Sequence, residues 1–264
     1  MSFTSTRGVA LDSSGSNLFV ADTGCHSVRQ ISISTGISTT IAGPASAATV
    51  YCTANTDGPG ASALFANPTG LAVDGAGNVF VSDADCNEIR KIAPDGTVST
   101  LAGQWWSSGS ANGIGTNAAF TVPTGLAFDG SGNLYVADSQ NNLIRKIVIA
   151  SGLVSTVAGQ PPPAATGYLN GVGTNAKFKF PNSVAFRAGN LYVADSGAYL
   201  IRKIIVASAI VSHVAGIFNT YLPFTNGLGT AATFYDPQAI AVSPAGVLFV
   251  GDSGNNRIRN ITGA

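Results

Sequence analysis

Charge is scarce in this chain. Of its 264 residues only 10% are charged, and 13 Lys plus Arg balance 13 Asp plus Glu, whereas globular chains average about 25% charged residues. The zero net charge argues against a strongly basic protein that neutralises nucleic-acid phosphates. Disorder is excluded too, because it requires low hydrophobicity and high net charge, while 45% of these residues are apolar. The chain is long and apolar enough to bury a sizeable core.

Long hydrophobic runs are lacking as well. A membrane-spanning helix needs about 20 consecutive apolar residues, and the most apolar run here, residues 204–214, is interrupted by Ser208, Ser212 and His213. Residues 1–4 do not begin a basic segment followed by an apolar one, which a signal peptide requires. We therefore expect no membrane span and no signal peptide in this chain.

Helical periodicity is also absent, and a short repeat takes its place. No segment keeps apolar residues at three- and four-residue spacing for three turns, as an amphipathic helix does. Instead, an apolar segment ending in Asp recurs five times, and an Arg follows seven residues after each Asp. The five pairs are Asp22 with Arg29, Asp83 with Arg90, Asp138 with Arg145, Asp195 with Arg202, and Asp252 with Arg259. Such self-similarity is the signature of a repeat architecture.

Each repeat unit reads as four β-strands. In the third unit, residues 125–129, 133–138, 143–148 and 154–159 form short apolar or alternating segments separated by Gly, Ser or Asn turns. Four short antiparallel strands repeated radially describe a β-propeller blade. We predict an all-β fold: a single β-propeller domain over residues 1–264, with five blades of four antiparallel strands, the last lacking its outer strand. A six-bladed parent, of which this chain would be a fragment, stays open as an alternative.

The same segments carry a family resemblance. Asn-Leu-Tyr-Val-Ala-Asp (133–138), Leu-Ile-Arg-Lys-Ile (143–147) and Val-Ser-Thr-Val-Ala-Gly (154–159) resemble the NHL repeat of NHL-type β-propellers. The resemblance extends over essentially the whole chain and implies the fold. It implies little about activity, because propellers are scaffolds for unrelated functions.

Residues for metal chemistry are few. Enzymes similar to NHL propellers include amidating lyases that hold zinc with several histidines, whereas this chain has only His26 and His213. Other propeller hydrolases coordinate calcium at the central channel, and Glu88 is the single Glu here. We therefore expect no catalytic residues, no metal site and no cofactor. A lyase-like or hydrolase-like propeller enzyme with calcium at the channel is kept as the alternative function.

A second motif recurs in the linkers between repeats. It starts with Asp or Asn and two nearby glycines, and it continues to a Phe and a Pro: Asp57–Phe65–Pro68, Asn112–Phe120–Pro123, Asn170–Phe178–Pro181 and Asn226–Phe234–Pro237. The glycines predict a compact turn, and we interpret each Phe as a wedge packed under its linker. Within the repeats, we expect each Asp to cap its hairpin and accept a hydrogen bond from its Arg. Because the pair occurs in every unit, structural ion pairs are favoured over a ring of carboxylates that binds a metal.

Aromatic residues gather in the linkers and hairpin turns, which alternating strand direction is expected to place on one face. The candidate partner-binding residues are Tyr51, Trp105, Trp106, Tyr168, Tyr199, Tyr221, Phe224 and Tyr235. Exposed aromatics among few charges indicate binding of a protein or a glycan, so we predict a non-enzymatic binding module. An RNA-binding NHL domain is a second alternative, disfavoured because only Lys177, Lys179 and Arg257 accompany the aromatics. A purely structural repeat that spaces other domains of a longer parent chain also fits.

The three cysteines of the chain make one disulfide possible. Cys25 and Cys86 occupy the same position in adjacent hairpin turns, and Cys52 lies in the long linker between them. We hypothesise that Cys52 bonds Cys25 or Cys86, with three free thiols as the alternative. A disulfide would favour an oxidising compartment, as does the glycosylation sequon Asn260-Ile-Thr262. We therefore expect the chain to be extracellular or at the cell surface.

Overall fold

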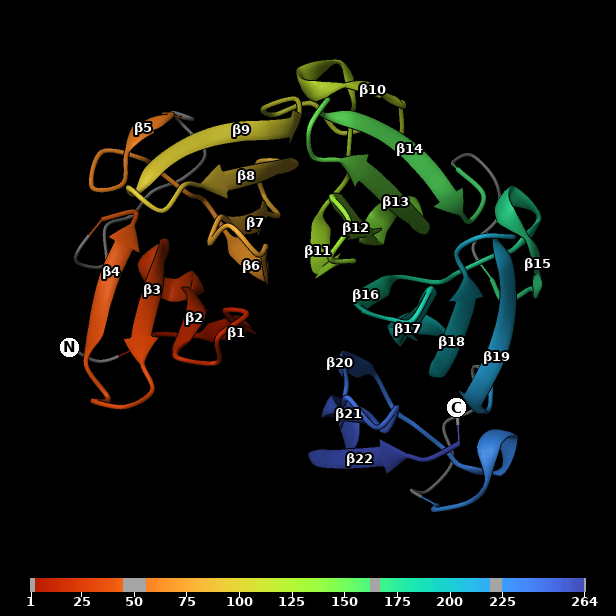
Figure 1. Ribbon diagram of the computed structural model, residues 1–264. Coiled ribbons are helices and arrows are strands. Elements are labelled where there is room, and N and C mark those ends of the chain that lie inside the picture. Colours follow the sequence, from red (N-terminus) through yellow and green to blue (C-terminus); the bar gives the residue numbers. More distant parts are fainter. Residues whose placement is uncertain (1–2, 45–55, 162–166, 219–224, 264) are drawn as a thin grey trace. The chain divides into compact units, whose positions relative to one another are not determined.

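The computed structural model of the protein describes residues 3–44, 56–161, 167–218 and 225–263. Their regular structure consists of β-strands and single-turn 3-10 segments, and the strands form five antiparallel sheets (Figure 1). The predicted all-β, five-bladed propeller is therefore confirmed. No helix among the described residues is long and apolar enough to cross a membrane.

The blades are numbered in chain order, and each is a meander of strands joined by short hairpins. Blade 1 contains β1 (Thr6–Leu11), β2 (Asn17–Asp22), β3 (Ser27–Ser32) and β4 (Ser38–Ala42). Blade 2 contains β6 (Pro68–Val73), β7 (Val79–Asp83), β8 (Glu88–Ile92) and β9 (Thr97–Gly103). Blade 3 contains β11 (Pro123–Phe128), β12 (Asn133–Asp138), β13 (Leu143–Val148) and β14 (Leu153–Ala158). Blade 4 contains β16 (Pro181–Arg187), β17 (Asn190–Asp195), β18 (Leu200–Ile205) and β19 (Ile210–Gly216), and blade 5 contains β20 (Pro237–Val242), β21 (Leu248–Asp252) and β22 (Arg257–Ile261).

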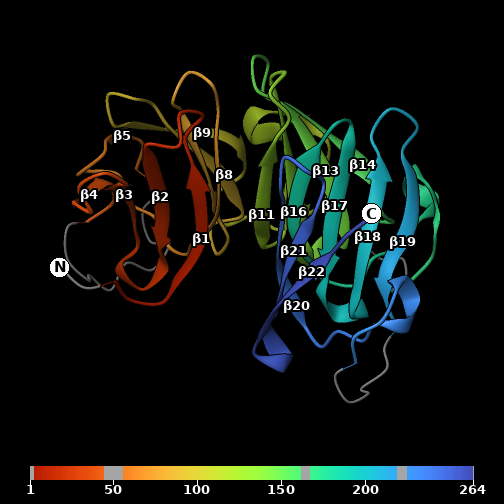
Figure 2. The ribbon, with the colours of Figure 1, turned by 60° about the horizontal axis from the view of Figure 1, so that its bottom comes forward.

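The chain divides into two compact units. Residues 1–134 and 147–154 form unit 1, and residues 135–146 and 155–264 form unit 2. Blades 1 and 2 belong to unit 1, blades 4 and 5 belong to unit 2, and the strands of blade 3 are divided between the units. Within one blade the strands lie side by side in sequence order, as β16 to β19 show in Figure 2.

The linkers add a fifth strand to three blades. β5 (Gly58–Pro59), β10 (Gly113–Ile114) and β15 (Gly171–Val172) pair antiparallel with β9, β14 and β19, the outermost strands of the blades that they lead into. The glycine spacing predicts only a compact turn here. The short strands form because they cover backbone groups at an otherwise open sheet edge. Among the described residues, blades 2 to 4 thus have five strands, blade 1 has four and blade 5 has three.

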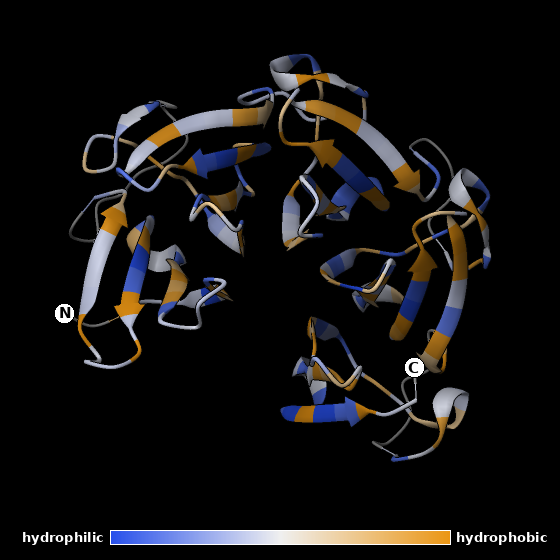
Figure 3. Ribbon diagram, in the orientation of Figure 1, coloured by the Kyte–Doolittle hydropathy of each residue, from blue (hydrophilic) through white to orange (hydrophobic). Residues whose placement is uncertain are grey.

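Apolar faces of neighbouring blades pack on each other within each unit. In unit 1, Phe19 of blade 1 and Val79 of blade 2 share one buried cluster with the linker residue Phe65. In unit 2, Ile201 of blade 4 and Leu248 of blade 5 share another. The hydropathy of β18 changes from apolar to polar and back along its length (Figure 3). The four linker Phe side chains are all buried, as wedges should be: Phe65, Phe120, Phe178 and Phe234.

Candidate functional site

The repeated Asp and Arg residues meet across their hairpins in four blades. The Nη1–Oδ2 distances are 3.6 Å for Arg29–Asp22, 2.8 Å for Arg145–Asp138, 3.2 Å for Arg202–Asp195 and 2.9 Å for Arg259–Asp252. These Asp side chains are fully buried, and the Arg side chains are at most 9% exposed. Each Asp ends the second strand of its blade and each Arg lies on the third, so they are diagonal neighbours on one face of the sheet.

In blade 4 the buried pair also fastens the preceding linker. Arg202 Nη2 donates to the carbonyl oxygen of Leu169 at 3.0 Å and to Asn170 Oδ1 at 2.9 Å. Its Nη1 donates to the carbonyl oxygen of Lys177 at 3.1 Å. The guanidinium lies 5.2 Å from the ring centre of Phe178, which is within cation–π range. One Arg thus holds the linker before and after its short strand β15.

Asp195, the other residue of the blade 4 ion pair, holds the linker as well. Asp195 Oδ1 accepts a hydrogen bond from the backbone N–H of Lys179 at 2.8 Å. Burial raises the pKa of Asp195, and the positive charge of Arg202 acts in the opposite direction. We call this arrangement the linker clamp: the Asp and Arg of one blade together with the linker Asp or Asn and the linker Phe that they hold.

Blade 5 repeats the linker clamp. Arg259 Nη2 donates to the carbonyl oxygen of Thr225 at 3.0 Å and to Asn226 Oδ1 at 3.2 Å. Its guanidinium lies 4.8 Å from the ring centre of Phe234. The linker amide was missed as an acceptor in the sequence, although it precedes its Arg by a nearly constant spacing.

Blade 2 departs from the pattern, and the predicted Asp83–Arg90 ion pair is wrong. Arg90 Nη2 instead pairs with Asp57 Oδ1 at 2.8 Å. The reason is the linker residue: Asp57 stands where the other linkers have Asn, and its carboxylate competes for the guanidinium. Asp83 accepts the backbone N–H groups of Ala66 at 3.0 Å and Asn67 at 2.8 Å, and burial raises its pKa.

Trp105 and Trp106 form an exposed turn in unit 1, directly after β9. Their exposed fractions are 42% and 62%, and the Ser107 N–H closes the turn on the carbonyl oxygen of Gln104 at 3.0 Å. Trp106 has a φ of +59°, a left-handed conformation that is uncommon for a bulky residue and that surrounding structure must hold in place. The side chains that the turn presents are the largest exposed aromatics in the described residues.

A buried carboxylate lies under this turn. Glu88 is only 2% exposed because it begins β8 at the position that Leu143 and Leu200 occupy in β13 and β18. It accepts a hydrogen bond from the backbone of Trp105. The pKa of Glu88 is raised to about 7, chiefly by burial. The positive charge of Arg90 opposes this rise, and the negative charges of Asp83 and Asp57 contribute to it.

The Glu88 carboxyl makes stability depend on pH. Its pKa is 4.5 when unperturbed and about 7 in the folded protein, so the folded protein binds this proton first as the pH falls. Between pH 8 and pH 5 the free energy of unfolding should therefore rise by about 2–3 kcal/mol from this group. Urea unfolding at both pH values should show that Glu88→Gln removes this part of the rise. An unchanged pH dependence in the variant would contradict the assignment.

Three other predicted aromatics pack against neighbours in unit 2. Tyr168 is half-buried, with Phe218 stacked at 5.4 Å, the edge of His213 at 5.6 Å, and the Arg202 guanidinium 4.7 Å from its ring centre. Tyr199 and Tyr235 meet edge to face at 5.3 Å. Tyr51, Tyr221 and Phe224 lie outside the described residues.

The place of Tyr199 explains its contact. It is the left-handed residue of its hairpin turn, with φ +63°, where blades 2 and 3 have Asn87 and Asn142. Asn87 Oδ1 accepts the backbone N–H of Val122, and Asn142 Oδ1 accepts that of Phe180, both at 2.8 Å. These hydrogen bonds tie each turn to the next linker, and the Tyr199–Tyr235 ring contact takes their place in blade 4. The exposed Trp105–Trp106 turn is therefore the strongest candidate site.

Cysteines and metal ligands are distributed as follows. Cys25 is a free thiol and Cys86 is disulfide-bonded, while Cys52 lies outside the described residues. The parts of the chain that the structure describes contain no cluster of three or more His, Cys, Asp or Glu side chains that could hold a metal ion. His213 is one of the two histidines considered as metal ligands. Burial lowers the pKa of its imidazole.

Comparison with known proteins supports the repeat. The NHL repeat family matches residues 120–147 and 234–259. The chain is 27% identical over 298 residues to NHL repeat-containing protein 2 of Bos taurus, covering 98% of this chain and 39% of the bovine protein. It is 31% identical over 170 residues to Protein SUPPRESSOR OF QUENCHING 1, chloroplastic, of Arabidopsis thaliana, covering 61% of this chain and 16% of that protein. The chain thus spans less than half the length of these curated relatives.

A solved structure shares the fold. An auxiliary nutrient binding protein from Bacteroides ovatus superposes with a TM-score of 0.70 at 16% identity, over 98% of this chain and 59% of that chain. At this identity the likeness concerns the fold alone. The repeat matches, the similarity to the bovine protein over 98% of this chain and the five observed blades agree with one another. The chain carries NHL repeats within a β-propeller of five blades.

Proposed function

We propose that this chain is a non-enzymatic binding module that recognises a protein partner through the Trp105–Trp106 turn. The observation that carries the proposal is the presentation of two adjacent, exposed Trp side chains on a turn anchored by the buried Glu88. Trp is one of the residue types enriched at the energetic centre of protein interfaces, with Tyr and Arg. NHL propellers commonly serve as protein-binding modules, which favours a protein over a glycan as the partner.

Rigidity supports this assignment. Trp106 is held in a left-handed conformation, and the turn is closed by a backbone hydrogen bond. A turn whose backbone is already fixed before binding loses little backbone entropy when the partner arrives. The scarcity of charge in the chain also suits a partner that contributes apolar surface.

The test compares which molecules bind to the wild type and to two matched variants. The wild type, the double variant Trp105→Ala/Trp106→Ala and the control Ile114→Ala are immobilised and exposed to the same cell extract, and to a glycan array in parallel. Ile114 is 58% exposed and lies in unit 1, so it controls for loss of exposed apolar surface. We expect proteins that the wild type and the control retain and the double variant loses.

Two results would contradict the proposal. If the double variant retains the same proteins as the wild type, the turn is not the binding site. If Trp-dependent binding occurs only on the glycan array, the partner is a glycan rather than a protein.

A further inference from the structure

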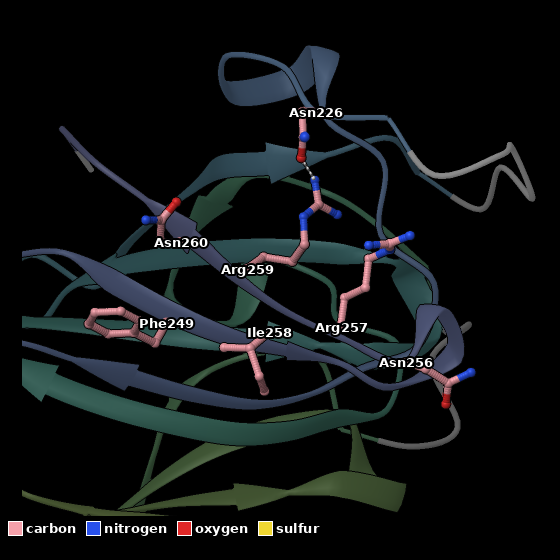
Figure 4. A pocket seen from close by; sticks show the side chains of 7 residues that line it. All are labelled: Asn226, Phe249, Asn256, Arg257, Ile258, Arg259 and Asn260. Carbon is pink, nitrogen blue, oxygen red and sulfur yellow. Dashed lines mark hydrogen bonds between the residues drawn. The ribbon is translucent and has the colours of Figure 1, made fainter.

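Blade 2 carries two carboxyl groups that the other blades lack at the same positions. Glu88 begins the third strand, where blades 3 and 4 bury a Leu. Asp57 lies in the linker, where blade 5 has the neutral Asn226, whose Oδ1 accepts a hydrogen bond from Arg259 Nη2 (Figure 4). Every blade has an Arg at the position of Arg90, so in blade 2 one guanidinium faces both additional carboxyl groups.

Negative charge exceeds positive charge in this cluster. Arg90 pairs with Asp57 at 2.8 Å, and Asp83 lies directly opposite Glu88 where β7 pairs with β8. The negative charges of both Asp residues act on Glu88, and the positive charge of Arg90 opposes them. Asp85, in the hairpin between the two strands, acts in turn on Asp83. One guanidinium cannot neutralise three carboxylates, so a proton on one of them relieves the excess negative charge.

The end of β9 and the turn that follows it cover Glu88. Glu88 pairs with Gly103, the last residue of β9. A Cβ atom at Gly103 would lie 2.9 Å from the Cα atom of Glu88, so the two backbones touch with no side chain between them. Two residues later, the backbone of Trp105 donates a hydrogen bond to the Glu88 carboxyl. Strand backbone and the Trp105–Trp106 turn thus keep water from this group.

Of these two covers, the Trp105–Trp106 turn is the easier one to displace. Antiparallel pairing joins β7, β8 and β9 along their lengths, whereas the turn presents exposed side chains and closes on the hydrogen bond from Ser107 to Gln104. The left-handed conformation of Trp106 adds strain that neighbouring contacts must offset. Exposed turns of this kind open at a lower free energy than paired strands. Water therefore reaches Glu88 most readily when the turn moves away.

We propose that Glu88 is a proton switch for the Trp105–Trp106 turn. The neutral carboxyl leaves the turn closed over it, and the ionised carboxyl opens the turn because a buried charge requires water. The consequence for binding rests on the proposed function. A partner that covers the turn excludes more water from Glu88, so binding takes up a proton and tightens as the pH falls. The coupling is reciprocal, since the protonated state favours binding as much as binding favours protonation.

The test uses the fluorescence of Trp105 and Trp106. The chain contains no other Trp, so Trp emission reports the state of this turn alone. As the pH rises, the emission of the wild type should shift to the red and acrylamide should quench it faster. The midpoint should lie above pH 4.5 and no higher than about 7, the values for an exposed and a buried Glu88. Glu88→Gln should keep the low-pH emission throughout, because its amide is neutral and still accepts the Trp105 N–H.

Two matched variants identify the group that takes the proton. Asp83→Asn removes a like charge, so the transition should persist with its midpoint at a lower pH. His26 is a second group of unit 1 that titrates near neutral pH, and its ring contacts the carbonyl oxygen of Ala66 beside Asp83. His26→Asn introduces the residue type that blades 2, 3 and 5 have at this left-handed position and should leave the transition unchanged. Loss of the transition in either variant would overturn the assignment to Glu88.

The fluorescence experiment needs no partner, so it judges the switch separately from the proposed function. Emission of the wild type that does not change with pH overturns the switch, as does an equal transition in Glu88→Gln. For a protein retained through Trp105 and Trp106, Kd should be at least about fivefold lower at about pH 6 than at about pH 8, equivalent to about 1 kcal/mol. Trp-dependent binding with the same Kd at both pH values overturns the switch and leaves the proposed function standing. A fluorescence transition without Trp-dependent binding does the reverse.

Discussion

Asp138→Asn should lower the free energy of unfolding by about 3–5 kcal/mol, because it leaves the Arg145 guanidinium buried without a countercharge. Both side chains are fully buried and their ion pair spans 2.8 Å. Urea unfolding followed by circular dichroism measures the loss. The double variant Asp138→Leu/Arg145→Met should recover most of it, since replacing a whole buried pair with apolar residues is often neutral.

Blade 2 provides the matched control for this prediction. Asp83 is as deeply buried as Asp138, but Arg90 pairs with Asp57 instead. Asn at position 83 can still accept the Asn67 N–H, and burial already disfavours the charge of Asp83. Asp83→Asn should therefore change the free energy of unfolding by less than about 1 kcal/mol. Equal losses in Asp83→Asn and Asp138→Asn would show that the ion pair is not the cause.

Phe178→Ala should also lower the free energy of unfolding by about 3–5 kcal/mol. The ring is 1% exposed and packs beneath the Arg202 guanidinium, so its removal leaves a cavity inside the linker clamp of blade 4. The same urea titration measures it. Phe180→Ala, two residues further on and 45% exposed, should lose less than about 1 kcal/mol, and a comparable loss at both positions would contradict the wedge assignment.

The fold could be predicted from the sequence because its signals are local and repeated. Alternating strands, glycine turns and the fixed offset between each Asp and its Arg all lie within one hairpin, where register follows from the turn. The linker Phe could be assigned for the same reason, since its spacing to the following Pro is constant. Four of the five Asp–Arg pairs meet as expected.

The remaining features depend on contacts between segments far apart in the chain. Asp57 reaches Arg90 only because the linker folds back along the outer edge of blade 2, and that path rests on the short strand β5. Glu88 is charged, yet its position in β8 is one where other blades bury Leu. An alignment of the repeats with one another indicates that the position of Glu88 is buried. The polarity of Glu88, considered alone, does not.

The aromatic candidates show the same limit. Composition alone could not tell how much of each ring is exposed. Tyr199 and Tyr235 meet each other because a left-handed turn residue faces the next linker. Trp105 and Trp106 stand on a turn that presents them to solvent. The distinction comes from backbone conformation, which the sequence encodes only weakly at a turn without Gly or Asn.

The most direct test of the account is the affinity of the Trp105→Ala/Trp106→Ala variant for a protein that the wild type retains. If the turn is the centre of the interface, Kd should rise by about thirtyfold or more, equivalent to about 2 kcal/mol. The free energy of unfolding should stay within about 1 kcal/mol of the wild type, because neither side chain is buried: Trp105 is 42% and Trp106 62% exposed. An unchanged Kd together with a loss of several kcal/mol in stability would show that the two Trp residues hold the fold rather than the partner.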